Sequence, residues 1–102
     1  MSRAEKFYKE AVKYRDKGEH ELAFTMFLNA ANEGHMEAQF SVGYSYNIGR
    51  GVAKDYVKSA EWYKKAANAG HVVAMNNLGL LYLNGNGVEQ DYQKAYMWFE
   101  KA

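Results

Sequence analysis

The apolar residues of this chain recur in steps of three and four, a spacing that is typical of amphipathic helices. Near residues 36–48, Ala38, Val42 and Tyr46 follow one another every four residues, so they share one helix face. Residues 72–84 show the same spacing and, like the first segment, end in a glycine-rich stretch. Glycine readily adopts the left-handed conformation that closes a helix. The pattern therefore predicts helices over about 36–48 and 72–84.

These two segments belong to a longer internal repeat with a period of 36 residues. Between residues 37–66 and 73–102, 12 of 30 aligned positions are identical, and the identical residues are mainly small, aromatic or turn residues. In each copy an aspartate, Asp55 or Asp91, precedes a second apolar stripe and is predicted to cap a second helix. Each unit is thus predicted to be a pair of helices that stacks on its neighbours.

The first third of the chain follows the same plan with a shorter connection. Tyr14 lies nine residues before Ala23, whereas the equivalent Tyr46 lies 13 residues before Ser59, so four loop residues are missing. We expect residues 17–20 to make this turn. The chain is therefore predicted to be a single helical-repeat domain over 1–102, with units at about 3–35, 36–71 and 72–102, the last without a closing helix.

The order of motif residues in the second and third units resembles a known repeat family. Both copies carry Gly-x2-Tyr-x2-Gly-x-Gly-Val-x2-Asp-Tyr-x-Lys followed by Trp, which is similar to the Sel-one-like repeat (SLR). Residues 4–35 resemble the related tetratricopeptide repeat (TPR). The resemblance implies an all-α fold, an α/α right-handed superhelical solenoid of about six antiparallel helices. The first helix of each pair would line its concave side.

The same resemblance implies a protein-binding adaptor or scaffold, a role that in bacteria serves assembly, signalling or host interaction. Amide side chains on the concave side could satisfy the backbone of an extended peptide, and aromatic ones could anchor it. Packing between repeats remains the alternative role for the same residues. The candidate partner-binding residues are Tyr8, Val12, Arg15, Glu37, Phe40, Ser41, Tyr44, Asn47, Val73, Asn76, Asn77, Leu80 and Asn84, with Glu5 and Lys9 beside them.

A clamp for a C-terminal carboxylate, as found in some tetratricopeptide domains, is poorly supported by these residues. Asn76 and Asn77 fall near such positions, but the basic partners are missing from the second and third units. Only Lys9 and Arg15 of the first unit could contribute them. We therefore expect recognition of another kind.

Composition and charge argue against several other classes. The formal net charge is +1, and neither half of the chain is polarised, so no nucleic-acid footprint is expected. No segment approaches the length of a membrane span. The chain has no cysteine, which excludes a thiolate nucleophile or a thiolate metal site.

No group of residues predicts catalysis, a metal site or a cofactor. The two Gly-x-Gly stretches follow predicted helices rather than strands, so we interpret them as turns and not as phosphate loops. His35 and His71 recur in the same inter-repeat turn, about one helix diameter apart, which is too far for one zinc ion. A role at the end of a helix is expected for both. We therefore expect a binding protein and not an enzyme.

Two further expectations concern the ends of the chain. The last helix presents Tyr96, Trp98 and Phe99 with no helix after it, which indicates a longer array, a short natural fragment, or a surface covered by a partner or a second copy. The first residues are charged, with no apolar leader, so we expect a cytoplasmic location, or a secreted or periplasmic one if a leader has been removed. The SLR relatives that carry paired cysteines are not matched, which favours a reducing compartment.

Overall fold

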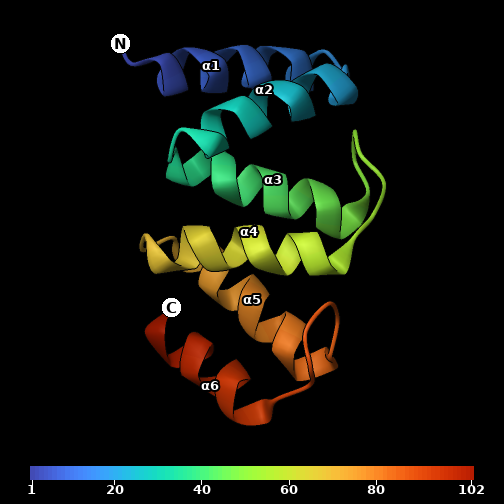
Figure 1. Ribbon diagram of the computed structural model, residues 1–102, viewed down its shortest axis with the longest axis vertical. Helices are drawn as coiled ribbons and strands as arrows, with labels where there is room; N and C mark the ends of the chain where they lie inside the picture. Colours follow the sequence, from blue (N-terminus) through green and yellow to red (C-terminus); the bar gives the residue numbers. More distant parts are fainter.

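The computed structural model describes residues 1–102 as six α-helices with no strand, which confirms the all-α solenoid of helix pairs. The helices run in alternating directions and stack along the long axis of the molecule, from α1 and α2 at one end to α5 and α6 at the other (Figure 1). Their bounds are α1 Arg3–Asp16, α2 His20–Asn32, α3 Met36–Ile48, α4 Tyr56–Asn68, α5 Val72–Asn84 and α6 Tyr92–Lys101.

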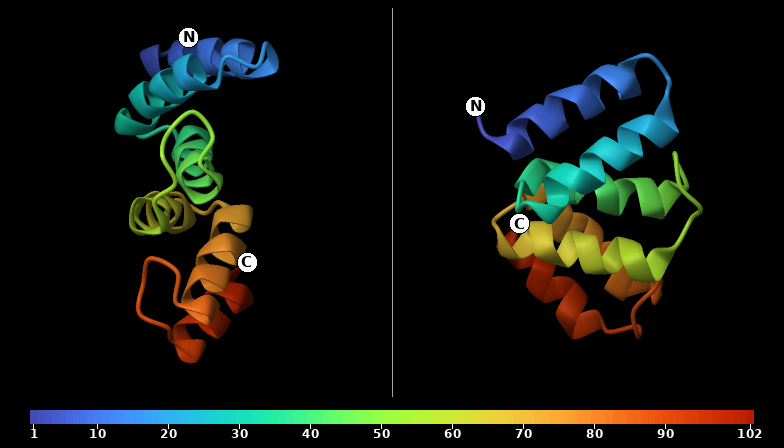
Figure 2. Two further views of the ribbon diagram at one scale, coloured as in Figure 1. Left: turned by 90° about the vertical axis from the view of Figure 1, so that its right-hand side faces the viewer. Right: turned by 45° about the horizontal axis from the view of Figure 1, so that its top comes forward.

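Each helix packs mainly against its neighbours in sequence, which is the arrangement of a repeat protein. The tightest pairs are α1 with α2, α3 with α4, and α5 with α6. The resulting body is elongated, with extents of 38 × 27 × 18 Å. The views in Figure 2 show the three pairs following one another, from α1 and α2 at one end to α5 and α6 at the other.

Small residues let the two helices of a pair approach closely. A Cβ atom on Gly43 would lie 2.7 Å from the Tyr63 ring, so only glycine fits where α3 crosses α4. At the same crossing the buried Ser59 hydroxyl donates a 2.8 Å hydrogen bond to the Gly43 carbonyl. Gly79 and Phe99 repeat this contact between α5 and α6. The repeated small and aromatic positions are therefore packing positions.

The predicted aspartate caps are confirmed. Asp55 and Asp91 accept hydrogen bonds from the backbone N–H groups of Lys58 and Lys94 through Oδ1. The turn between α1 and α2 differs slightly from the prediction, because His20 is already the first residue of α2. Glu19 occupies the cap position without a side-chain hydrogen bond, so backbone bonds alone close this turn.

Each long loop contacts the preceding repeat through a glycine. Gly51 has φ +77°, and a Cβ atom there would overlap the His20 carbonyl at the start of α2. Gly87 has φ +74° and would overlap the Tyr56 carbonyl at the start of α4 in the same way. The loops are turns, as predicted. Because each loop approaches so closely, the residue before its glycine, Arg50 or Asn86, lies beside the previous repeat.

The C-terminal surface differs from the prediction at Trp98. Its side chain is only 6% exposed, because it lies on the α6 face that packs against Leu78 and Leu81 of α5. Phe99 is half-buried and makes a T-shaped contact with Tyr96 at 6.2 Å. Tyr96 alone of the three predicted residues is open to solvent, at 61% exposure.

Candidate functional site

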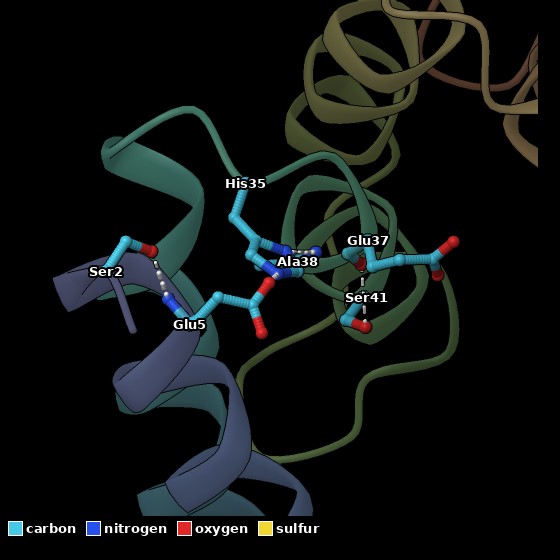
Figure 3. Close-up of polar contacts among 6 residues, drawn as sticks. All are labelled: Ser2, Glu5, His35, Glu37, Ala38 and Ser41. Carbon is cyan, nitrogen blue, oxygen red and sulfur yellow. Dashed lines mark hydrogen bonds and ion pairs between the residues drawn. The ribbon is translucent and has the colours of Figure 1, made fainter.

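A histidine clamp joins the first helix of one repeat to the first helix of the next. The Nδ1 atom of His35 accepts from the Ala38 N–H at the start of α3, at 3.1 Å. Its Nε2 atom lies 2.9 Å from Glu5 Oε1 on α1, as Figure 3 shows, and its ring stacks on Tyr8 at 4.5 Å. In Figure 3 the Ser2 side chain caps the same turn of α1 that carries Glu5. The predicted role of His35 at a helix end is confirmed.

The same clamp recurs one repeat later. His71 caps α5 by accepting from the Ala74 N–H, lies 3.2 Å from Glu37 Oε1, and stacks on Phe40 at 4.5 Å. Four of the candidate site residues therefore already make contacts within the chain, as parts of the two clamps. These four are Glu5, Tyr8, Glu37 and Phe40.

A pocket of about 270 Å³ opens between the first and second repeats; we call it the first-junction pocket. The predicted residues Arg15, Phe40, Ser41 and Tyr44 meet in its lining, although they come from two different helices. The other lining residues were not singled out by the sequence, and they are His20, Ala23, Phe24, Phe27, Ser45 and Arg50. Sites for drug-sized ligands have volumes of ~300–1,000 Å³. The first-junction pocket is slightly smaller, so it suits a single side chain of a partner.

The lining of the first-junction pocket includes two arginines, Arg15 and Arg50. Arg50 makes no ion pair, and Arg15 has only its chain neighbour Asp16, with Nε 3.4 Å from Oδ1. No aspartate or glutamate lines the pocket. Burial raises the pKa of the Tyr8 hydroxyl, Glu37 on α3 adds to this rise, and Arg15, on the same helix as Tyr8, opposes it.

A smaller pocket of about 150 Å³ lies at the equivalent place between the second and third repeats; we call it the second-junction pocket. The repeat alignment pairs Arg15 with Asn47 and Arg50 with Asn86, so amides replace both guanidinium groups. Four predicted residues, Asn47, Asn77, Leu80 and Asn84, meet in its lining. The two pockets thus share positions and differ in side-chain chemistry.

The two junctions also differ at Tyr63. It occupies the position of Phe27 in the repeat alignment, and its buried hydroxyl has no hydrogen-bond partner. Burial raises the pKa of Tyr63, while the side chains of Asn77 and Asn47 oppose the rise. The hydroxyl therefore lies near these two amides, which line the second-junction pocket.

The remaining predicted residues lie outside the pockets. Val73 and Asn76 are exposed on α5, and Val12 is half-buried against the core of the first repeat. The sequence reasoning missed Arg50 because the Gly-x-Gly stretch was assigned to turn formation alone. The available signal was the alignment of Arg50 with Asn86 and, once the four missing loop residues are allowed for, of Arg15 with Asn47.

No group of three or more histidine, aspartate or glutamate side chains is arranged to hold a metal ion. None of the six helices has both the length and the apolar character required to span a bilayer.

Stacked helix pairs with a repeated junction define an α-helical repeat protein of the solenoid class. The pattern of the Sel1 repeat matches residues 37–71 and 72–102, so the chain belongs to the Sel1 repeat family. Proteins of this family are typically non-enzymatic modules that bind protein partners.

Three relatives illustrate the similarity. The ERAD-associated E3 ubiquitin-protein ligase component HRD3A of Arabidopsis thaliana is 39% identical over 48 residues, which are 47% of this chain and 7% of that protein. A Sel1 repeat protein from Oxalobacter formigenes is 38% identical with a TM-score of 0.78, covering 80% of this chain and 34% of the other.

The third is c5321, a protective antigen present in uropathogenic Escherichia coli strains that displays an SLR fold. It is 34% identical with a TM-score of 0.91, covering 96% of this chain and 22% of the other. The chain therefore spans about a third or less of each of these three proteins.

Proposed function

We propose that this chain binds a partner protein through the surface formed by α1, α3 and α5, as an adaptor or scaffold. The observation that carries the proposal is the pair of equivalent pockets along this surface, in which eight of the predicted binding residues meet. Pockets lined by aromatic, amide and guanidinium groups hold the anchors of a partner well. No turnover of generic hydrolase substrates is expected.

Two exposed side chains make the surface testable without disturbing the core. Tyr44 is 41% exposed in the first-junction pocket, and its counterpart Leu80 is 47% exposed in the second. The second helices offer a matched pair, Leu22 on α2 and Val57 on α4, which are exposed to a similar degree. Replacing either pair by serine removes similar apolar area from opposite sides of the helix pairs.

The test immobilises the parent chain, Tyr44→Ser/Leu80→Ser and Leu22→Ser/Val57→Ser, and compares what each retains from a lysate of the source organism. We expect a partner that the parent and the second-helix variant retain and the first-helix variant loses. Equal retention by both variants, or loss by the second-helix variant alone, would overturn the proposal. Circular dichroism first establishes that both variants are folded.

Self-assembly is a second candidate, favoured by the exposed side chains of Tyr92, Tyr96 and Met97 on α6. Solvent-exposed apolar clusters of this kind mark contact surfaces. Light scattering across a concentration series would detect it. Growth of the particle mass in the parent and its absence in Tyr96→Ser/Met97→Ser supports self-assembly, and a strict monomer at high concentration excludes it.

A further inference from the structure

We propose that the first-junction pocket recognises an internal acidic segment of a partner protein, with an aromatic side chain in the pocket and a carboxylate on either side of it. The carboxylates would lie against Arg15 and Arg50. The proposal rests on the function proposed above and adds the chemistry of the partner. It also predicts that only one of the two junctions has this preference.

The charge of the pocket supports an acidic partner. Arg50 has no ion-pair partner, and Arg15 uses only Nε toward Asp16, so its remaining N–H donors are available. Glu37, the acidic residue of α3, is already held 3.2 Å from His71. Guanidinium groups with free donors bind carboxylates through charge-assisted hydrogen bonds, which are stronger than neutral ones.

The floor of the pocket supports an aromatic anchor between the carboxylates. Phe24, Phe27 and Phe40 all contribute to its lining, and Tyr44 lies beside them at 6.1 Å from the Phe40 ring. Aromatic pairs in edge-to-face or offset contact are worth more than their buried area alone. A pocket of about 270 Å³ leaves room for such a side chain.

Comparison with the second junction indicates that the loop does not require an arginine before its second glycine. The loop glycines Gly51 and Gly87 make the same close approach to the preceding repeat, with arginine before one and asparagine before the other. Because asparagine at position 86 permits the same close approach as arginine at position 50, the Arg50 guanidinium is free to serve a ligand. Two arginines with available donors beside aromatic side chains are therefore best explained by recognition.

The placement of the arginines favours an internal segment over a chain terminus. Arg15 lies in the last turn of α1, and Arg50 lies in the loop after α3, so the two donors come from different repeats. Two acidic residues flanking one anchor match two separate guanidinium groups. A single terminal carboxylate offers one negative charge, whereas two flanking acidic residues offer one to each guanidinium group.

The test uses peptides capped at both ends and titrated into the intact chain by NMR. The acidic probe is acetyl-Gly-Asp-Phe-Glu-Gly-amide, and its neutral analogue is acetyl-Gly-Asn-Phe-Gln-Gly-amide. Arg15→Asn/Arg50→Asn gives the first junction the side chains of the second. Lys6→Asn/Lys64→Asn removes the same charge from exposed positions outside the pocket.

We expect the neutral peptide to bind the parent about tenfold more weakly than the acidic one, and the difference to shrink with salt. The arginine variant should bind the acidic peptide as weakly as the neutral one, with its affinity for the neutral peptide unchanged within about twofold. The lysine variant should behave as the parent. Shifted amide signals should lie around the first junction.

Three results would overturn the proposal. The first is equal binding of the acidic and neutral peptides, or no saturable binding of the acidic one at millimolar concentration. The second is that the arginine variant loses affinity for the acidic and the neutral peptide to the same extent. The third is tighter binding of acetyl-Gly-Asn-Gln-Phe with a free carboxylate. If the arginine variant still captures the cellular partner while Tyr44→Ser/Leu80→Ser loses it, the proposed function stands and the acidic preference fails.

Discussion

The two repeat junctions of this chain can be compared position by position, because one backbone arrangement occurs twice. At the first junction, arginines and an aromatic floor surround an open pocket of about 270 Å³. At the second, amides line a pocket of about 150 Å³, and Tyr63 stands at the position of Phe27. The glycine contacts, histidine clamps and aspartate caps are common to both repeats.

This comparison separates the residues that build the solenoid from those that are free to vary. Positions with the same role at both junctions hold the helices together, and their substitution should affect stability. Positions that differ, such as Arg15 with Asn47, should affect binding instead. The predictions below test this separation, beginning with the largest effect.

Gly51→Ala and Gly87→Ala should each destabilise the chain by about 3 kcal/mol, because a positive φ and an overlap with a carbonyl add together. Both glycines make the same close approach, to His20 and to Tyr56. Urea unfolding followed by circular dichroism measures the loss. A loss below about 1 kcal/mol at either site would show that the loop can move away and that the contact does not fix the junction.

His71→Ala should cost about 2 kcal/mol, because it removes a helix cap, a carboxylate partner and a stacked ring together. His35→Ala should cost about 1 kcal/mol, since the His35 side chain is more exposed. His71→Asn keeps a capping acceptor and should recover about half of the loss. Thermal unfolding of the three variants measures these losses of stability. If His71→Asn recovers none of the stability lost in His71→Ala, stacking on Phe40 and not capping is the main contribution of His71.

Tyr63→Phe should stabilise the second junction by about 1 kcal/mol, because it removes a buried hydroxyl without a partner. The raised pKa of Tyr63 means that the folded state favours the neutral phenol. Its contribution is complete below the ordinary pKa of 10.0 and is lost as the pH rises through the higher folded value. The variant should therefore lose less stability above pH 10 than the parent.

Phe27→Tyr is the matched variant at the first junction. It adds a hydroxyl next to the open pocket, so we expect weaker binding of the acidic peptide, by about threefold, while Tyr63→Phe leaves that binding unchanged. Unfolding at several pH values and the NMR titration measure the two effects. Equal effects of the two variants on peptide binding would remove the distinction between the junctions.

Arg15→Asn/Arg50→Asn should change stability by no more than about 0.5 kcal/mol, which is the smallest effect in this series. Both side chains are exposed, and the contact of Arg15 with Asp16 is a surface ion pair. Chemical denaturation of the variant beside Lys6→Asn/Lys64→Asn checks this. A loss well above 1 kcal/mol would mean that the arginines support the fold, and their absence from the second junction would then need another explanation.

The sequence predicted the helices well because their ends are marked locally. Gly49 and Gly85 close α3 and α5, and Asp55 and Asp91 begin α4 and α6, all within a few residues of the apolar stripes they bound. Because the sequence repeats with a period of 36 residues, each of these signals occurs twice. Local signals of this kind require no knowledge of how the helices pack.

The pocket was harder to predict, because its charges come from residues far apart in the chain. Arg15 and Arg50 become neighbours in one lining only when α3 and its loop pack against the first pair. The shorter first turn also changes the offset from 36 to 32 residues for α1, which hides the match between Arg15 and Asn47. Trp98 was misplaced for a related reason, since its burial depends on the angle at which α6 meets α5.

The contact of Gly51 with the start of α2 has a consequence for how such arrays diversify. It makes each pocket the joint product of two neighbouring units, with Arg15 supplied by one and Arg50 by the next. Duplicating a single unit therefore copies only half of a pocket, and inserting a unit between two others replaces one pocket with two new ones. Recombination of a small set of units can thus generate many ligand preferences without any change inside a unit.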